Sequence, residues 1–190
     1  MAINYLGRLA TSRDALQTKM NLICGIAGTP TVPVRKIRHI EDVLSLLATF
    51  PDCAGYAANR RGEPLFDLET EAGVQDLVYL ILRPSIPDLV PEQPVAGPTR
   101  QHVIEDFRSQ LLRLVIEAKL VRDKRHGRTL KTELHTDIGE YKNDPLCDDL
   151  IFFIRDPNMH IESPSGLMKG IQGVHTHEQR SLRVHCLVQR

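Results

Sequence analysis

The chain has 190 residues, and its 24 basic and 24 acidic side chains give a formal net charge of zero. This length favours one domain around a single core, and 42% hydrophobic with 25% charged residues is globular composition, which excludes an extended disordered chain. Zero net charge neither requires nor excludes a nucleic-acid partner, because a basic face can offset an acidic site.

The N-terminal region has a charge pattern unlike that of a secretory signal, and the longest apolar stretch falls short of 18 residues. We therefore expect a cytoplasmic protein without a membrane partner. The cysteines are scattered without a CxxC pair, which predicts reduced thiols rather than a disulfide framework. They are Cys24, Cys53, Cys147 and Cys186.

The first predicted elements are helical. Apolar residues at helical spacing predict a helix over 40–50, closed by Pro51 and followed by an irregular connection over 53–67. Thr70 is typical of an N-cap, and the apolar stripe that follows predicts a second helix ending before Arg83 and Pro84.

The centre of the chain changes to strand character. Five prolines over 84–99 predict a loop with a short extended piece near Pro94. The β-branched and aliphatic residues that follow predict neighbouring strands over about 101–108 and 112–121, joined by a short turn near Ser109.

The last third alternates helix and strand. We expect a helix from Thr129 to about Lys142 and a strand over 150–154 that is covered on both faces because it is continuously apolar. Residues 158–180 are predicted to be mostly loop, or a short helix around 167–171, and residues 182–188 are predicted to form a final strand. The expected fold is α/β, a mixed sheet flanked by helices.

The second predicted strand contains two opposite charges, which suggest a functional site. Because strand side chains alternate between faces, Glu117 and Lys119 point the same way while Ala118 points into packing. Burying such a pair is costly without a partner or a role. A turn between the two strands brings Asp106 to the same edge of the sheet as Glu117.

Oxygen ligands of this kind suit Mg²⁺, which takes one or two carboxylates and keeps several waters. We expect Asp106, Glu117 and the backbone carbonyl of Ala118 to hold Mg²⁺, for which Mn²⁺ can substitute. Lys119 would orient or deprotonate the attacking water, or steady the phosphate.

The residues Asp106…Glu117-Ala118-Lys119 resemble the signature of the PD-(D/E)XK nuclease superfamily, whose domains have a restriction-endonuclease-like fold. Four longer segments resemble, in the expected order, the first helix, the central strand, the next helix and the next strand of such domains in bacterial defence proteins. They are residues 71–77, 115–122, 134–142 and 150–157.

The resemblance implies a nuclease-like domain over 40–190 after an N-terminal helical extension over 1–39. It implies that Glu71 is a further acid near the metal, with Gln75 one turn on and facing the same side. The implied function is Mg²⁺-dependent endonucleolytic cleavage of DNA in bacterial defence. The implied partners are DNA and either a second copy of the chain or a sensor or regulatory protein.

Several alternatives stay open. Glu105 can replace Asp106 as the first acid, and an inactive nuclease-fold scaffold or an RNA-directed nuclease can share the fold. The stretch containing Lys124, Arg125 and Arg128 is either a solvated turn or a phosphate-contacting loop. A solvated helix face is one alternative for Asp137, which stays open, and we interpret Tyr141 as a packed ring.

Overall fold

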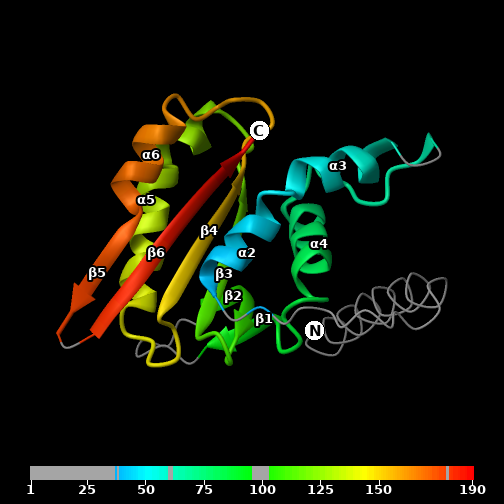
Figure 1. Cartoon of the computed structure of the whole chain (residues 1–190). Helices are drawn as coiled ribbons and strands as arrows, with labels where there is room; N and C mark the ends of the chain where they lie inside the picture. Colours follow the sequence, from blue (N-terminus) through cyan, green and yellow to red (C-terminus); the bar gives the residue numbers. More distant parts are fainter. Residues whose placement is uncertain (1–36, 38, 60–61, 96–102, 179) are drawn as a thin grey trace, which may run out of the picture. The chain divides into compact units, whose positions relative to one another are not determined.

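A computed structural model describes residues 37, 39–59, 62–95, 103–178 and 180–190, without the side chains of 92–95 and 103–105. Its described part contains a six-stranded sheet in the order β1-β2-β3-β4-β6-β5 (Figure 1). The strands are β1 Val90–Val95, β2 Val103–Ser109, β3 Leu114–Leu120, β4 Asp149–Arg155, β5 Gly173–His177 and β6 Arg180–Gln189. The predicted α/β fold, a mixed sheet flanked by helices, is confirmed.

The centre of the sheet is parallel and its margins are antiparallel. β4 pairs in parallel with β3 and β6, whereas β1, β2 and β5 join through antiparallel pairs. β4 is buried from Asp149 to Ile154, because helices cover both of its faces. The prediction of a doubly covered strand at 150–154 is therefore confirmed.

Among the described residues, five helices pack on the two faces of the sheet (Figure 1). Helices α2, α3 and α4 contribute to the hydrophobic core on one face, and α5 and α6 to the core on the other. Their bounds are α2 Ile40–Leu47, α3 Phe50–Asn59, α4 Glu71–Leu82, α5 Lys124–Tyr141 and α6 Pro164–Ile171. No described helix is long and apolar enough to cross a membrane.

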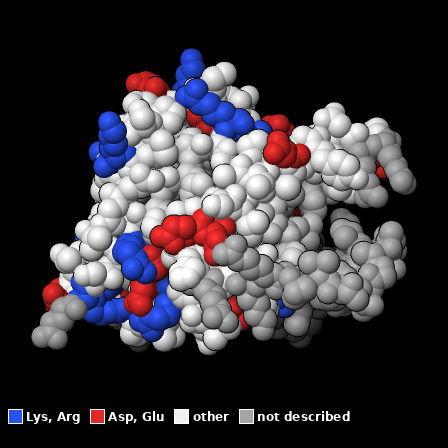
Figure 2. Space-filling model, in the orientation of Figure 1, with Lys and Arg blue, Asp and Glu red and all other residues white. Residues whose placement is uncertain are grey.

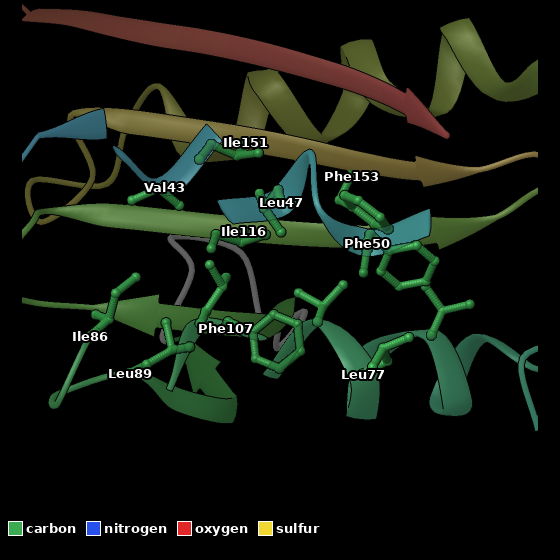
Figure 3. Packing of buried hydrophobic residues seen from close by; sticks show 14 of the residues in the cluster. Val43, Leu47, Phe50, Leu77, Ile86, Leu89, Phe107, Ile116, Ile151 and Phe153 are labelled. Carbon is green, nitrogen blue, oxygen red and sulfur yellow. The ribbon is translucent and has the colours of Figure 1, made fainter. Parts of the chain in front are cut away.

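The core beneath α2 holds the central strands in place. Figure 3 shows apolar side chains of α2 and α3 directed onto β3 and β4. Phe50 contacts Phe153 with ring centroids 4.8 Å apart. Since even-numbered residues of β3 fill this core, the odd-numbered Glu117 and Lys119 project toward the α5 side.

Two helix boundaries differ from the sequence prediction. The helix predicted over 40–50 ends at Leu47, and Pro51 lies in the first turn of α3 instead of closing a helix. Proline is tolerated in a first turn because its missing N–H would have no partner inside the helix. The predicted irregular connection over 53–67 is consequently wrong for the part that α3 occupies.

Helix α5 begins at Lys124 rather than at Thr129. The Asp123 side chain accepts a 2.8 Å hydrogen bond from the His126 N–H and caps the helix. A Cβ on Gly127 would lie 2.5 Å from the His160 carbonyl oxygen, so this turn packs closely against the chain after β4. The basic stretch predicted as a loop or turn therefore belongs to a helical first turn.

The sequence pattern also missed β5, which lies inside the region 158–180 predicted as mostly loop, and it gave β1 only as a short extended piece. Both strands are at the edges of the sheet, where side chains need not alternate and proline is tolerated. The Thr70 cap is confirmed, because its hydroxyl accepts from the Gly73 N–H. Residues 1–36 of the predicted extension lie outside the described residues.

Candidate active site

The site begins where β2 separates from β3. Paired residues of the two strands run from Ser109↔Leu114 to Phe107↔Ile116. At the next residue toward the start of β2, the backbone pairing with β3 stops. There the Asp106 side chain takes its place, and its Oδ2 accepts a 2.7 Å hydrogen bond from the Ala118 N–H. The structure thus brings the Asp106 carboxylate to the strand that carries Glu117 and Lys119. The side chain of Glu105, the alternative first acid, lies outside the described residues.

Two side chains from the first turns of α4 contact β2 and β3 at this point. Gln75 Nε2 donates to Asp106 Oδ1 at 2.8 Å, so both oxygens of Asp106 have a donor. Glu71 Oε2 accepts from the Leu120 N–H at 3.4 Å and lies 3.8 Å from Arg122 Nη2. Glu71 and Gln75, predicted to face one side of the helix, both reach the strands of the site.

Glu117 and Lys119 form the buried part of the site. Glu117 is only 4% exposed. Its Oε1 accepts a hydrogen bond from the Tyr141 hydroxyl, and its Oε2 lies 3.5 Å from Lys119 Nζ. This carboxylate is therefore contacted from its own strand and from α5.

Helix α5 adds two further carboxylates that sequence reasoning missed. Lys119 Nζ lies 3.6 Å from Glu133 Oε1 and 3.6 Å from Asp137 Oδ2. Asp137 does not lie on a solvated helix face, the alternative that the sequence left open, since its side chain is 19% exposed and turned toward Lys119. The Tyr141 ring is packed as expected, but its hydroxyl contacts Glu117. The sequence did hold one indication, since the four-residue spacing of positions 133, 137 and 141 places these side chains on one face of a helix.

The electrostatics of the two central acids are unusual. Burial raises the pKa of Asp106 to about 6, against the hydrogen bond from the Ala118 N–H, which lowers it. Burial and the neighbouring charge of Asp106 raise the pKa of Glu117 to about 8. Neighbouring acids that are withdrawn from solvent favour a bound cation or a bound proton. Shifted pKa values of this kind are common at functional sites.

Lys119 is the cation that these acids share. Burial acts to lower its pKa, but Glu117, Asp137 and Asp106 outweigh burial and hold the pKa above its usual range. Lys119 is therefore an ammonium donor at neutral pH in this arrangement. Such a group orients oxygen atoms and stabilises negative charge.

The donor set fits a divalent cation of the magnesium type. Asp106 and Glu117 are two carboxylates close enough for one to raise the pKa of the other. The Ala118 N–H points toward β2, where it donates to Asp106. Because the N–H and C=O of one strand residue point to the same side of the strand, the Ala118 carbonyl also points toward β2. Among described residues, no group of three or more His, Cys, Asp or Glu side chains is arranged to hold a metal ion. Water would therefore have to supply the remaining ligands, as Mg²⁺ prefers.

A basic surface follows directly after β3. Arg122, Lys124, Arg125 and Arg128 are exposed, on the connection to α5 and its first turns. Figure 2 shows Lys and Arg side chains along the upper edge of the drawn face, beyond the carboxyl ends of β4 and β6. Just inside this segment, His126 Nε2 lies 3.4 Å from Glu133 Oε2. The segment is thus connected to the carboxylates around Lys119.

The mixed sheet, with an acid in the middle of β2 and a Glu-Ala-Lys sequence in β3, defines a restriction-endonuclease-like domain. Comparison with family models gives a match over residues 41–188 to the DpnII-MboI family of restriction endonucleases (REase_DpnII-MboI). The chain belongs to this family, which supports a DNA endonuclease of the restriction type. Comparisons with curated proteins and with solved structures give no match.

Proposed function

We propose that the chain is a Mg²⁺-dependent endodeoxyribonuclease with Asp106, Glu117 and Lys119 at its catalytic centre. One observation carries the proposal: the Asp106 carboxylate lies against the Ala118 N–H, beside Glu117, where β2 and β3 separate. Burial raises the pKa values of both acids, so keeping them ionised in the folded chain costs free energy. That cost supports a functional rather than a purely structural role.

In this proposal Asp106, Glu117 and the Ala118 carbonyl hold the ion, and Glu71 stands beside them at the start of α4. When bound, Mg²⁺ lowers the pKa of a coordinated water and offsets charge on the scissile phosphate. Lys119 donates hydrogen bonds that orient the attacking water or stabilise the phosphate oxygens. Gln75 keeps Asp106 oriented through its 2.8 Å hydrogen bond and reaches DNA from α4.

The basic surface after β3 would position the DNA. Lys124, Arg125 and Arg128 are exposed, so their charges are free to contact backbone phosphates. Such contacts bind any DNA sequence and weaken as salt increases. We further propose that two copies act together on a duplex, because cutting both strands requires two centres, and that the cleavage serves defence against foreign DNA.

Cleavage of plasmid DNA tests the proposal directly. The wild-type protein is expected to cut in Mg²⁺ or Mn²⁺ but not in EDTA, and Lys119→Ala is expected to lose activity. Lys169→Ala, an exposed lysine in the last turn of α6, is the matched control and should cut like wild type. Equal inactivity of wild type and Lys119→Ala on DNA and RNA would support the inactive scaffold. Cleavage of RNA alone would support the RNA-directed alternative.

A further inference from the structure

The last turn of α5 places a phenol against the most deeply buried acid of the site. Tyr141 is 3% exposed and Glu117 is 4% exposed, and the Tyr141 hydroxyl donates to Glu117 Oε1. Because a buried carboxylate without a donor is costly, this contact affects how Glu117 is oriented as well as how it packs.

The two oxygens of Glu117 are held by different elements. Tyr141 on α5 contacts Oε1, and Lys119 on β3 lies 3.5 Å from Oε2. Donors at both oxygens restrict rotation of the carboxylate. A carboxylate that is already oriented loses less conformational freedom when it takes up an ion.

The position of Tyr141 along α5 is set by independent packing. Leu130, Leu134 and Ile138 of the same helix are buried in the core between α5 and the sheet. This packing fixes the distance of the last turn from β3. The phenol oxygen is therefore presented to Glu117 by a rigid element, which is how outer residues tune metal-binding groups.

We propose that Tyr141 is a positioning residue that orients the Glu117 carboxylate for divalent-cation binding. The proposal rests on the proposed function of Glu117 as a metal-binding group. It makes α5 part of the working site, although the helix carries no residue of the Asp…Glu-x-Lys signature.

Tyr141→Phe tests the proposal because it removes one oxygen and keeps the buried ring. Mn²⁺ binding to the full chain, measured by calorimetry, is expected to weaken by about 10-fold or more, in line with the loss of other outer-sphere hydrogen bonds. Tyr79→Phe is the matched control: it removes a phenol that accepts from Arg83 on the opposite face of the sheet. Its Mn²⁺ affinity is expected to equal that of wild type.

A second measurement separates orientation from folding. In a Glu117→Gln background, Tyr141→Phe is expected to cause no further loss of Mn²⁺ affinity, because the group that it orients is already changed. A purely structural tyrosine would instead lower the melting temperature and leave Mn²⁺ affinity as in wild type, which would overturn the proposal. Absence of Mn²⁺ binding by the wild-type chain would overturn it as well.

DNA cleavage distinguishes this proposal from the proposed function. If wild type binds Mn²⁺, Tyr141→Phe binds it weakly and neither cuts DNA, the positioning role stands and the nuclease proposal fails. If wild type cuts DNA, Tyr141→Phe is expected to need about 10-fold more Mg²⁺ for half-maximal rate while approaching the wild-type rate at saturation. An unchanged Mg²⁺ requirement contradicts the positioning role alone.

Discussion

Two charged clusters lie at opposite ends of the paired strands β3 and β4, and they are built in opposite ways. From the middle of β3 toward its carboxyl end, Glu117 is buried beside Lys119, and the half-buried Asp106 of β2 lies close by. At the amino end of β4, one acid has two basic partners. Asp149 accepts from Arg183 Nε and Nη2 at 2.8 and 2.6 Å, and His185 Nε2 lies 3.1 Å from its Oδ1.

The pKa values express this difference. Burial acts to raise the pKa of Asp149, but the hydrogen bonds from Arg183 and His185 outweigh it and hold the pKa below its usual range. Asp106 and Glu117 have raised pKa values because burial is not offset in the same way. The charge of Asp149 is therefore compensated in a way that stabilises the fold. The charges of Asp106 and Glu117 are not, which is typical of a binding site.

The largest expected effect is on cleavage, through Glu117→Gln. This variant keeps the side-chain shape and an acceptor for Tyr141 but removes the charge, and we expect the rate to fall about 10³-fold, since metal-assisted charge stabilisation is worth several kcal/mol. Single-turnover cleavage of DNA measures this rate. At pH 8 without metal the same variant should melt at the wild-type temperature or above. A cleavage rate within about threefold of wild type would contradict the catalytic role of the Glu117 charge.

Lys119→Met is expected to lower the cleavage rate about 10²-fold, the loss typical of one electrostatic donor in an active site. Because Glu133 and Asp137 lose the cation that they share, this variant should also unfold more readily than wild type at neutral pH. Urea denaturation and single-turnover cleavage, measured on the same preparation, separate the two effects. A stable Lys119→Met protein with full activity would contradict both roles.

Asp149→Asn tests the other end of the sheet. The change breaks the paired hydrogen bonds to Arg183, whose side chain is 59% exposed, so solvent limits the cost. We expect a loss of about 1–2 kcal/mol in the free energy of unfolding, measured in urea. Cleavage by the folded fraction should equal that of wild type, and a loss of cleavage without a loss of stability would contradict the assignment.

The pH dependence of stability should have opposite signs for the two clusters. Glu117 has an ordinary pKa of 4.5 and a folded pKa of about 8, so the metal-free folded chain keeps a proton that the unfolded chain releases between these values. Its stability should fall as pH rises through that window. Glu117→Gln should therefore gain stability relative to wild type from pH 5 to pH 8.

Asp149 behaves the other way. Its folded pKa lies below the ordinary value of 3.8, so its contribution is present above about pH 4 and is lost as pH falls through the folded pKa. The difference in unfolding free energy between wild type and Asp149→Asn should shrink in acid. Urea denaturation from pH 3 to pH 8 on both variants provides the measurement, and slopes of the same sign would contradict the contrast between the two ends.

The amino-acid sequence alone was enough to predict the fold class, the Thr70 cap and the shared face of Glu117 and Lys119. These follow from local rules, namely apolar periodicity, capping chemistry and the alternation of side chains along a strand. The nearness of Asp106 to β3 was also foreseen, because a short turn forces neighbouring strands together.

The residues that surround Lys119 and Glu117 depend on how the helices pack against the sheet. Asp137 and Tyr141 lie on a helix whose pattern does not reveal which partner its polar residues meet, and packing of α5 on the sheet places them against β3. The contact of Glu71 with Leu120 likewise depends on how α4 packs, since 49 positions separate the two residues. Local patterns show which residues share a face, whereas the packing of the elements decides what that face contacts.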